Sequence, residues 1–272
     1  MSKSFSHGFY GSLAYTYTFS QDVTGNPGSQ AASVWSANAT SGTQNTQELS
    51  YSQYAVPHRI VATLSYRVEY LKHLASTFTF FYEGASQGTY SYIYNGDLNQ
   101  DGNSADLMYI PKDPSEIKFA NLAASGTTPA FSAQQQSDAF FQMVSKSHYL
   151  SHHMGQTSER NGPRYPFFHR VDFSFLQDLF TNIGKHRNTI QFSVDCTNFL
   201  NLLNKDWGLR DFYPTSTPLR ASKNPTTGAV VYQLATYTPN GSTTPILVDK
   251  TFIRSTSTSS TWAMQFGLRY IF

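Results

Sequence analysis

Apolar and polar side chains alternate at every second residue through much of this 272-residue sequence, and this period constrains the fold more than any other feature. At the end of the chain, small or polar residues such as Gln265 and Arg269 separate a set of large apolar residues. This set consists of Trp262, Met264, Phe266, Leu268, Tyr270 and Phe272. A period of two places the set on one face of a β-strand, and about 9–11 tilted residues suffice to cross a bilayer. The pattern is typical of a membrane-spanning strand with one face toward lipid.

Five earlier segments alternate in the same way: residues 5–19, 58–70, 74–94, 167–178 and 187–197. One face of each segment is apolar or aromatic, and the other carries hydroxyl and charged groups. Charged groups are costly in hydrocarbon but stable in a water-filled lumen. We therefore expect the following charged side chains to face a lumen: Arg59, Arg67, Glu69, Arg170, Asp172, Asp195 and Arg269.

The connections between these segments alternate strictly between long and short. Long loops cover residues near 20–57, 95–165 and 198–260, and short turns lie near Leu71–His73 and Leu179–His186. Outer-membrane barrels have long extracellular loops and short periplasmic turns. The sequence therefore predicts an all-β fold, an antiparallel transmembrane β-barrel portion of about six strands located in the cell outer membrane.

Six strands are too few to close a barrel, because single-chain barrels begin at about eight strands, and an open sheet in lipid leaves unpaired edges. We therefore expect residues 1–272 to be one portion of a larger barrel. The first residues lack the charged start and apolar run of a signal peptide. No stretch approaches about 18 consecutive apolar residues, so we expect no transmembrane helix.

Composition narrows the function further. Charged residues make up 13% of the chain, about half the usual share, and aromatic residues make up 15%. The net charge of +2 is too small to indicate a nucleic-acid-binding protein. Cys196 is the only cysteine, which excludes an internal disulfide and a multi-cysteine metal site. The serines and carboxylates form no catalytic sequence pattern, so we do not expect an enzyme.

Several blocks resemble, in the same order, the C-terminal barrel of TonB-dependent outer-membrane receptors. The blocks are Val56-Pro57-His58-Arg59 with the following IVATLSYRVEY, residues 80–111, 164–178, 191–208 and 264–272. The resemblance covers nearly the whole chain and implies the last strands of a plugged barrel of roughly 22 strands. Blocks corresponding to the family's plug domain and earlier strands are not found in the sequence.

The resemblance also implies a function. The chain would be part of a transporter that imports large nutrients, such as oligosaccharides or peptides, and would not transport alone. Its implied partners are outer-membrane lipid, the remainder of the barrel and plug, the TonB complex, and a surface lipoprotein. The terminal strand from Trp262 to Phe272 looks like the signal that the barrel-assembly machinery reads in outer-membrane proteins. We expect deletion of Phe272 to reduce assembly.

A candidate calcium loop lies within the second long loop. Oxygen-bearing side chains alternate around Gly102 as at the start of an EF-hand loop, at Asp97, Asn99, Asp101, Asn103 and Asp106. Met108 occupies the position where an EF-hand has its bidentate Glu, so Asp106 would substitute for it. The alternative is an Asn/Asp/Gly-rich turn whose side chains bond their own backbone. No cofactor is required by either interpretation; Ca²⁺ is the candidate ligand.

Two further groups are interpreted as structural. His148, His152 and His153 cluster in the same loop, but without a Cys or a helical partner they indicate a solvated loop. Tyr90, Tyr92 and Tyr94 alternate on one face, where they would stack on a ligand or, as we favour, pack within the protein or at a membrane interface.

Two other classes of protein fit the sequence. One is a soluble or surface-attached β-sandwich that binds carbohydrate through aromatic loops. The other is a truncated gene remnant without a function of its own. A soluble, monomeric, folded 30.5 kDa product would favour the sandwich.

Overall fold

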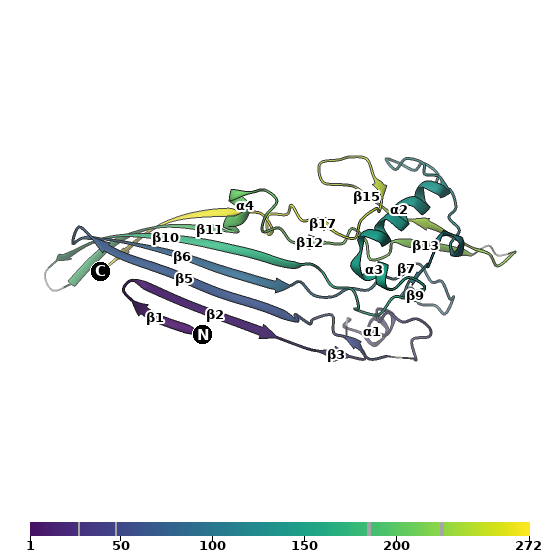
Figure 1. Cartoon of the computed structure of the whole chain (residues 1–272), viewed down its shortest axis with the longest axis horizontal. Coiled ribbons are helices and arrows are strands. Elements are labelled where there is room, and N and C mark those ends of the chain that lie inside the picture. Colours follow the sequence, from purple (N-terminus) through teal and green to yellow (C-terminus); the bar gives the residue numbers. More distant parts are fainter. Residues whose placement is uncertain (27, 47, 184–185, 224–225) are drawn as a thin grey trace.

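The computed structural model describes residues 1–26, 28–46, 48–183, 186–223 and 226–272. One large sheet and a cap built from the long connections make up the molecule (Figure 1). The sheet's short turns lie at one end, and all three long connections lie at the other (Figure 1). Within the described ranges, no helix combines the length and the apolar character needed to cross a membrane.

The large sheet is a seven-stranded antiparallel meander whose spatial order follows the chain. Its strands are β1 (Ser2–Ser6), β2 (Phe9–Tyr17), β5 (His58–Tyr70), β6 (Leu74–Ser86), β10 (Phe167–Ile183), β11 (His186–Thr197) and β18 (Ala263–Ile271). The two edge strands, β1 and β18, do not pair with each other among the described residues, so the sheet is open. The mostly β, antiparallel fold expected from the alternation is confirmed.

The first predicted segment, residues 5–19, is wrong as a single strand because the chain turns back within it. His7 and Gly8 both have positive φ, 51° and 82°, which is the backbone of a two-residue hairpin turn. This turn divides the segment into β1 and β2 and adds a seventh strand. The turn at Leu71–Lys72 has two positive φ values as well. The predicted turn near Leu179–His186 is too long, because Leu179–Ile183 continue β10 and His186 begins β11 in one antiparallel ladder; residues 184 and 185 lie outside the described residues.

The register of the ladders sorts the side chains into two faces. One row across the sheet is Leu64, Phe80, Phe173, Cys196 and Met264. The next row is Ser65, Thr79, Ser174, Asp195 and Gln265, on the opposite face. We call these the apolar face and the polar face. Because a one-residue slip would exchange the faces, the alternation fixes this register.

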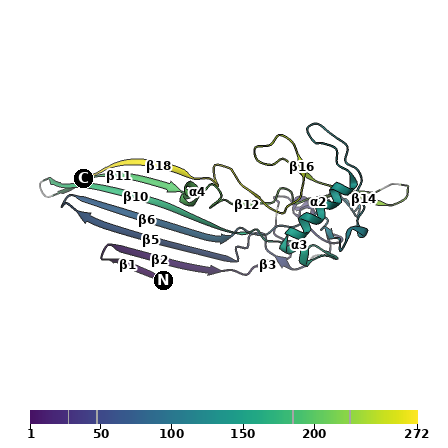
Figure 2. The ribbon, with the colours of Figure 1, turned by 45° about the horizontal axis from the view of Figure 1, so that its top comes forward.

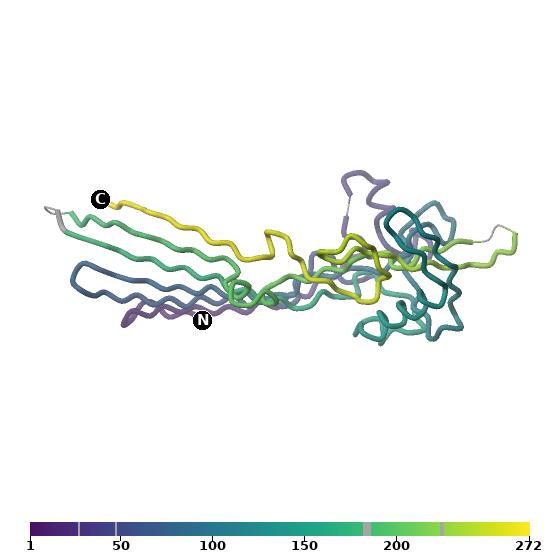
Figure 3. Tube along the Cα trace, turned by 90° about the horizontal axis from the view of Figure 1, so that it is seen from above, coloured from purple at the N-terminus to yellow at the C-terminus, as the bar shows by residue number. Residues whose placement is uncertain are grey.

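The sheet is curved. The strands β1, β2, β5 and β6 are spread out in Figure 1 and overlap in Figure 3, whereas β10, β11 and β18 overlap in Figure 1 and are spread out in Figure 3. The two halves therefore lie in different planes. Right-handed strand twist produces such coiling in antiparallel sheets of this size.

The cap consists of the described residues of 18–57, 87–166 and 198–262. Its helices are α1 (Ala31–Ser36), α2 (Ala133–Lys146), α3 (His148–His152), α4 (Phe199–Leu203) and the 3-10 turn η1 (Pro114–Glu116). Its strands are β3 (Gln21–Asp22), β4 (Ser50–Tyr51), β7 (Tyr94–Asn95), β8 (Tyr109–Ile110), β9 (Gln156–Thr157), β12 (Asp211–Phe212), β13 (Leu219–Lys223), β14 (Val230–Leu234), β15 (Thr236–Tyr237), β16 (Ile246–Leu247) and β17 (Ile253–Arg254). They form small sheets, of which β14-β13-β7 joins the second and third connections.

The largest helix, α2, shows why this cap is ordered. Ser132 and Gln135 form a reciprocal capping box at its start, and Phe140, Met143 and Val144 are buried on one side. These residues belong to one hydrophobic core, whose buried members are Tyr90, Tyr92, Tyr94, Met108, Ile110, Ile117, Phe140, Met143, Val144, Leu150, Leu219, Leu234, Tyr237, Leu247 and Val248. Every member lies in the cap. The hydrophobic core of the molecule is therefore built by its long connections.

Candidate functional site

The apolar face of the large sheet is the most unusual surface of the molecule. Leu64 is 53% exposed, Phe266 64% and Leu268 79%, although all three lie in regular strands. Neighbouring rings on this face contact one another, as in the pair Phe78–Phe175 with ring centroids 5.1 Å apart. A contiguous apolar surface of this kind indicates contact with lipid or with another protein.

Side-chain chemistry on this face changes with height along the strands. At the cap end, Tyr15 and Tyr82 bond the Nδ1 atoms of His58 and His169, each at 2.8 Å. The middle rows are aliphatic or phenylalanine in most positions, and Tyr70 and Tyr270 occupy the turn end. Aromatic residues with a polar tip prefer the two water–lipid boundaries.

The polar groups within the apolar face satisfy one another. The Tyr70 hydroxyl contacts Ser76 Oγ at 3.0 Å and donates to Gln177 Oε1 at 2.9 Å. The Ser76 hydroxyl also donates to Gln177 Oε1, at 2.6 Å. These groups lie near the turn end of the strands, so the cost of placing them on this face is reduced by mutual hydrogen bonding.

Ion pairs cover the polar face. Arg67 lies 2.9 Å from Asp178 and 3.3 Å from Glu69, and Arg170 lies 2.7 Å from Asp172. The predicted lumen-facing side chains Arg59, Arg67, Glu69, Arg170, Asp172, Asp195 and Arg269 all lie on this one face by strand register. The structure therefore brings together the residues that the sequence grouped.

Two acidic residues that the sequence did not single out complete this network. Glu83 accepts from Arg59 at 2.7 Å, and Asp178 accepts from both Arg67 and Gln191. Asp195 accepts a 2.6 Å hydrogen bond from the Ser174 hydroxyl. The signal was present, because Glu83 and Asp178 both occupy polar positions of the alternation, but their pairing depends on strand register.

The terminal strand β18 pairs only with β11 among the described residues, and its other edge is free. Met264, Phe266, Leu268 and Tyr270 share the apolar face, as the alternation predicted. Trp262 and Phe272, at its two ends, are 46% and 89% exposed. A strand with a free backbone edge is available for pairing with another strand.

The candidate calcium loop is closed by its own backbone. Asp97 accepts from the amides of Asp101 and Gly102 at 3.2 and 2.8 Å, and Asp101 accepts from that of Asn103 at 2.9 Å. Asn99 Oδ1 also accepts from Asp101, at 2.9 Å. These are the contacts of an Asn/Asp-rich turn.

The last acid of that loop is buried. Asp106 accepts from the Leu98 amide at 2.8 Å, and burial raises the pKa of its carboxyl. Across the described residues, no three His, Cys, Asp or Glu side chains are grouped so as to hold a metal ion. Calcium binding stays a prediction.

The histidines and tyrosines of the second connection have structural roles. The prediction of an irregular loop without a helical histidine pair is wrong, because Ser147 caps the one-turn helix α3 and brings the rings of His148 and His152 to 4.3 Å. Tyr90 and Tyr92 are buried, and their hydroxyls are 3.2 Å apart. Burial raises the pKa values of both. The packing role that we favoured for the tyrosines is confirmed.

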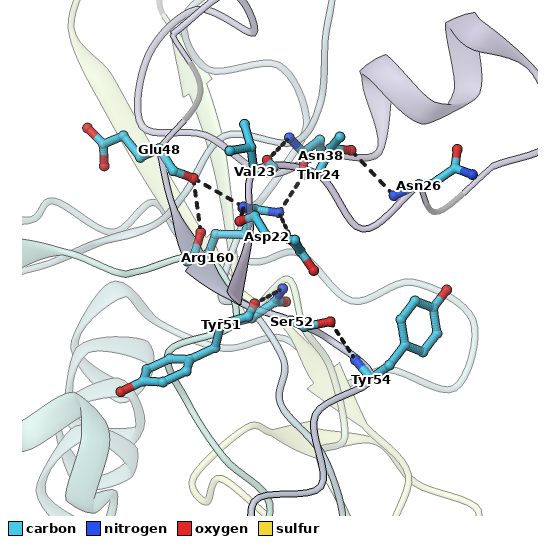
Figure 4. Close-up of polar contacts among 12 residues, drawn as sticks. Asp22, Val23, Thr24, Asn26, Asn38, Glu48, Tyr51, Ser52, Tyr54 and Arg160 are labelled. Carbon is cyan, nitrogen blue, oxygen red and sulfur yellow. Dashed lines mark hydrogen bonds and ion pairs between the residues drawn. The ribbon is translucent and has the colours of Figure 1, made fainter. Parts of the chain in front are cut away.

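Arg160 is a residue that sequence reasoning missed. It is 7% exposed and joins the second connection to the first (Figure 4). Its guanidinium donates to the Asp22 carboxylate at 3.1 Å, to the Asn38 side chain at 2.9 Å, and to the carbonyls of Asp22 and Glu48 at 2.6 and 3.2 Å. A single arginine carries no periodic signal, so only the folded cap identifies it.

A polar cavity of about 370 Å³ lies beside Arg160, between the first and second connections. Hydroxyl groups line much of it, together with the residues Glu48, Tyr51 and Glu159. The cavity is large enough for a small polar ligand.

No protein-family model matches the chain, and comparisons with curated proteins and with solved structures gave no match either.

Proposed function

We propose that this chain is a section of the wall of an outer-membrane β-barrel, with its apolar face toward lipid and its cap outside the cell. The observation that carries the proposal is the uncovered apolar face. Large apolar surface exposed to water costs roughly 25 cal/mol per Å². A face formed by rows of Phe, Leu and Tyr across regular strands is stable only where water is excluded from it.

The dimensions of this face support the proposal. On β5 the apolar row runs from Ile60 to Tyr70. At about 3.3 Å per residue this corresponds to about 33 Å along the strand, and a tilt of about 40° reduces it to about 25 Å. That is the height of the apolar band on outer-membrane barrels. The bands of tyrosine at both ends would then lie at the two lipid boundaries.

The polar face would line the lumen. On this face Arg59, Arg67 and Arg170 are paired with Glu83, Asp178 and Asp172, and charged side chains of this kind are stable in a water-filled lumen. The free edges of β1 and β18 would be costly in lipid, where no water satisfies the backbone. We propose that further strands pair with these edges, so that the chain acts as part of a larger barrel.

Within outer-membrane barrels, we propose a TonB-dependent transporter that imports large nutrients, of the oligosaccharide or peptide class, rather than an enzyme. The ordered cap supports this class, because a cap with its own core can hold ligand above a lumen. The remainder of the barrel, its plug, the TonB complex, the barrel-assembly machinery and a surface lipoprotein would be partners. The chain alone would not transport.

A carbohydrate-binding β-sandwich would place a second sheet against the apolar face. The described residues place no sheet there, since Leu64, Phe266 and Leu268 are more than half exposed. The small sheets of the chain all lie in the cap. The exposed face therefore favours the membrane proposal over the sandwich.

Protease protection tests the proposal. The full chain is diluted from urea into phosphatidylcholine vesicles, floated on a density gradient and digested with proteinase K. Because the free edges of β1 and β18 are costly in lipid, we expect copies of the chain to pair through these edges as they insert. The chain should then float, its cap should be cleaved, and the strand pairs β5–β6 and β10–β11 should survive until detergent dissolves the vesicles. A folded monomer that stays in the aqueous fraction, with all segments equally cleaved, would contradict the proposal.

A further inference from the structure

The short helix α4 forms a foot at the base of the cap, resting on the apolar face. Its first residue, Phe199, lies 5.3 Å from Phe173 and 6.3 Å from Phe80 between ring centroids. Figure 2 shows α4 where β11 ends, between the sheet and the cap. We call residues 199–207 the foot.

Hydrogen bonds hold the foot rigidly in place. Asn198, in the left-handed region with φ 50°, donates from its side chain to the carbonyls of Gly208 and Ser260 at 2.9 and 2.7 Å. Asn201 is buried and accepts from the Trp262 amide at 3.2 Å. The foot is thus joined to the start of β18.

Three of the exposed side chains of the foot are large and apolar. Leu202 is 37% exposed, Leu203 61% and Trp207 52%. The charges beside them are Lys205 and Asp206, and Asp206 is paired with Arg254 at 2.9 Å. An exposed Trp and Leu pair beside a lysine, continuous with an apolar face, has the composition of a membrane-interface segment.

We propose that the foot binds the lipid surface and fixes the height of the cap above the bilayer. This inference rests on the proposed membrane function. Phe199 would join the foot to the apolar face of the sheet, Leu203 and Trp207 would enter the lipid boundary, and Lys205 would reach the headgroups. Because Asn198 and Asn201 bond Gly208, Ser260 and Trp262, the foot would also fix where the third connection begins and ends relative to the lipid surface.

The tryptophans of the chain provide the test. Trp207 lies in the foot, Trp262 at the start of β18, and Trp35 in α1 of the cap, with exposures of 52%, 46% and 46%. Three variants each keep one tryptophan, the other two being replaced by Phe, and the full chain is inserted into vesicles. The probe is phosphatidylcholine brominated on its acyl chains near the glycerol. We expect loss of fluorescence from Trp207 and Trp262, and none from Trp35.

Three other quenching patterns distinguish failure of the foot from failure of the membrane proposal. Quenching of Trp262 while Trp207 responds no more than Trp35 would overturn the foot and leave the membrane proposal standing. Quenching of none of the three would overturn both. Equal quenching of all three would overturn the foot, because the cap would then lie in the lipid as well.

A matched pair of leucines provides a second test without fluorescence. Leu203 in the foot and Leu49 in the cap are 61% and 63% exposed, so neither substitution disturbs a core. We expect Leu203→Lys to reduce the fraction of chain that floats with vesicles and Leu49→Lys to leave it unchanged. Equal flotation of the two variants would overturn the role of the foot.

Discussion

Arg160 shows how one residue can organise a cap that has little regular structure. Where a β-ladder would join two segments through backbone hydrogen bonds, the Arg160 guanidinium donates to two carbonyls and two side chains of the first connection. Because it is buried, its removal leaves acceptors without donors, which costs more than the loss of a surface pair. The planar fork of arginine suits this arrangement, and lysine would not reproduce it.

We expect Arg160→Met to destabilise the cap by about 2 kcal/mol. The first connection should be released, so limited proteolysis within residues 18–57 should become faster while the core around α2 stays protected. Arg254→Met is the matched control, because Arg254 pairs with Asp206 where both side chains are 55% exposed. Equal proteolysis of the two variants would show that Arg160 does not hold the connections together.

Asp106 gives the cap a dependence on pH. Burial raises the pKa of its carboxyl, so the folded chain binds a proton at this site more tightly than the unfolded chain. Ionised Asp106 therefore costs stability above its raised pKa, and the cost disappears as the pH falls below the unfolded value. We expect Asp106→Asn to raise the unfolding temperature of the cap near neutral pH, with the gain vanishing in acid.

Asp113 is the matched control for Asp106, because its pKa is shifted in the opposite direction. Hydrogen bonds from the side chain and amide of Ser115 lower its pKa, so its ionised form contributes stability that is lost as the pH falls through the folded value. Asp113→Asn should lower the unfolding temperature near neutral pH, again with no difference in acid. If both variants raised the unfolding temperature near neutral pH, or both lowered it, the opposite pKa shifts given to Asp106 and Asp113 would be contradicted.

Among the elements, the hairpin β1–β2 depends on a single glycine. Gly8 has φ +82°, and a Cβ there would lie 2.3 Å from the Arg67 carbonyl oxygen on β5. The Gly8 carbonyl also accepts from the Arg67 amide at 2.8 Å. The turn is therefore fixed both to its own hairpin and to the next strand.

We expect Gly8→Ala to cost at least about 1–2 kcal/mol, because alanine disfavours the left-handed region and its Cβ has no room. Hydrogen exchange should become faster for the amides of β1 and β2. Gly11→Ala, where the nearest atom to an added Cβ is 3.9 Å away, should not show this increase. The same exchange in both variants would mean that the turn does not determine the hairpin.

Most of the strands were predictable and the cap was not, for a physical reason. The predicted segment 74–94 was too long, because β6 ends at Ser86 and Tyr90, Tyr92 and Tyr94 belong to the cap core. Each strand carries a local period of two, so β5 appears in the sequence with the bounds that the structure has. The turn at His7–Gly8 was missed because His-Gly lacks the usual Asn-Gly signal. The cap core joins Tyr90, Phe140 and Leu219 from distant segments without a common period. Arg160 likewise depends on contacts that only folding creates.

At the scale of the whole molecule, apolar side chains serve two separate purposes. In the cap they are buried and hold irregular connections together, whereas on the sheet they stay exposed along one face. Polar groups also serve two purposes. In the cap they form buried hydrogen bonds and ion pairs such as Arg160–Asp22, and on the sheet they form ion pairs such as Arg170–Asp172 on the polar face. This division agrees with the proposed barrel wall, in which one face meets lipid and the other a lumen.

The two faces of one strand test this division directly. Val194 and Ser193 are neighbours on β11, the strand beside the edge strand β18. Val194 lies on the apolar face in register with Phe175 and Phe78, and Ser193 lies on the polar face. A lysine on the lipid face near the bilayer midplane costs about 2–4 kcal/mol, whereas a lumen position tolerates charge. We expect Val194→Lys to reduce insertion of the full chain into vesicles strongly, and Ser193→Lys to insert like the parent chain, by protease protection. If both variants inserted equally, or if Ser193→Lys were the impaired one, lipid would not be the solvent of the apolar face.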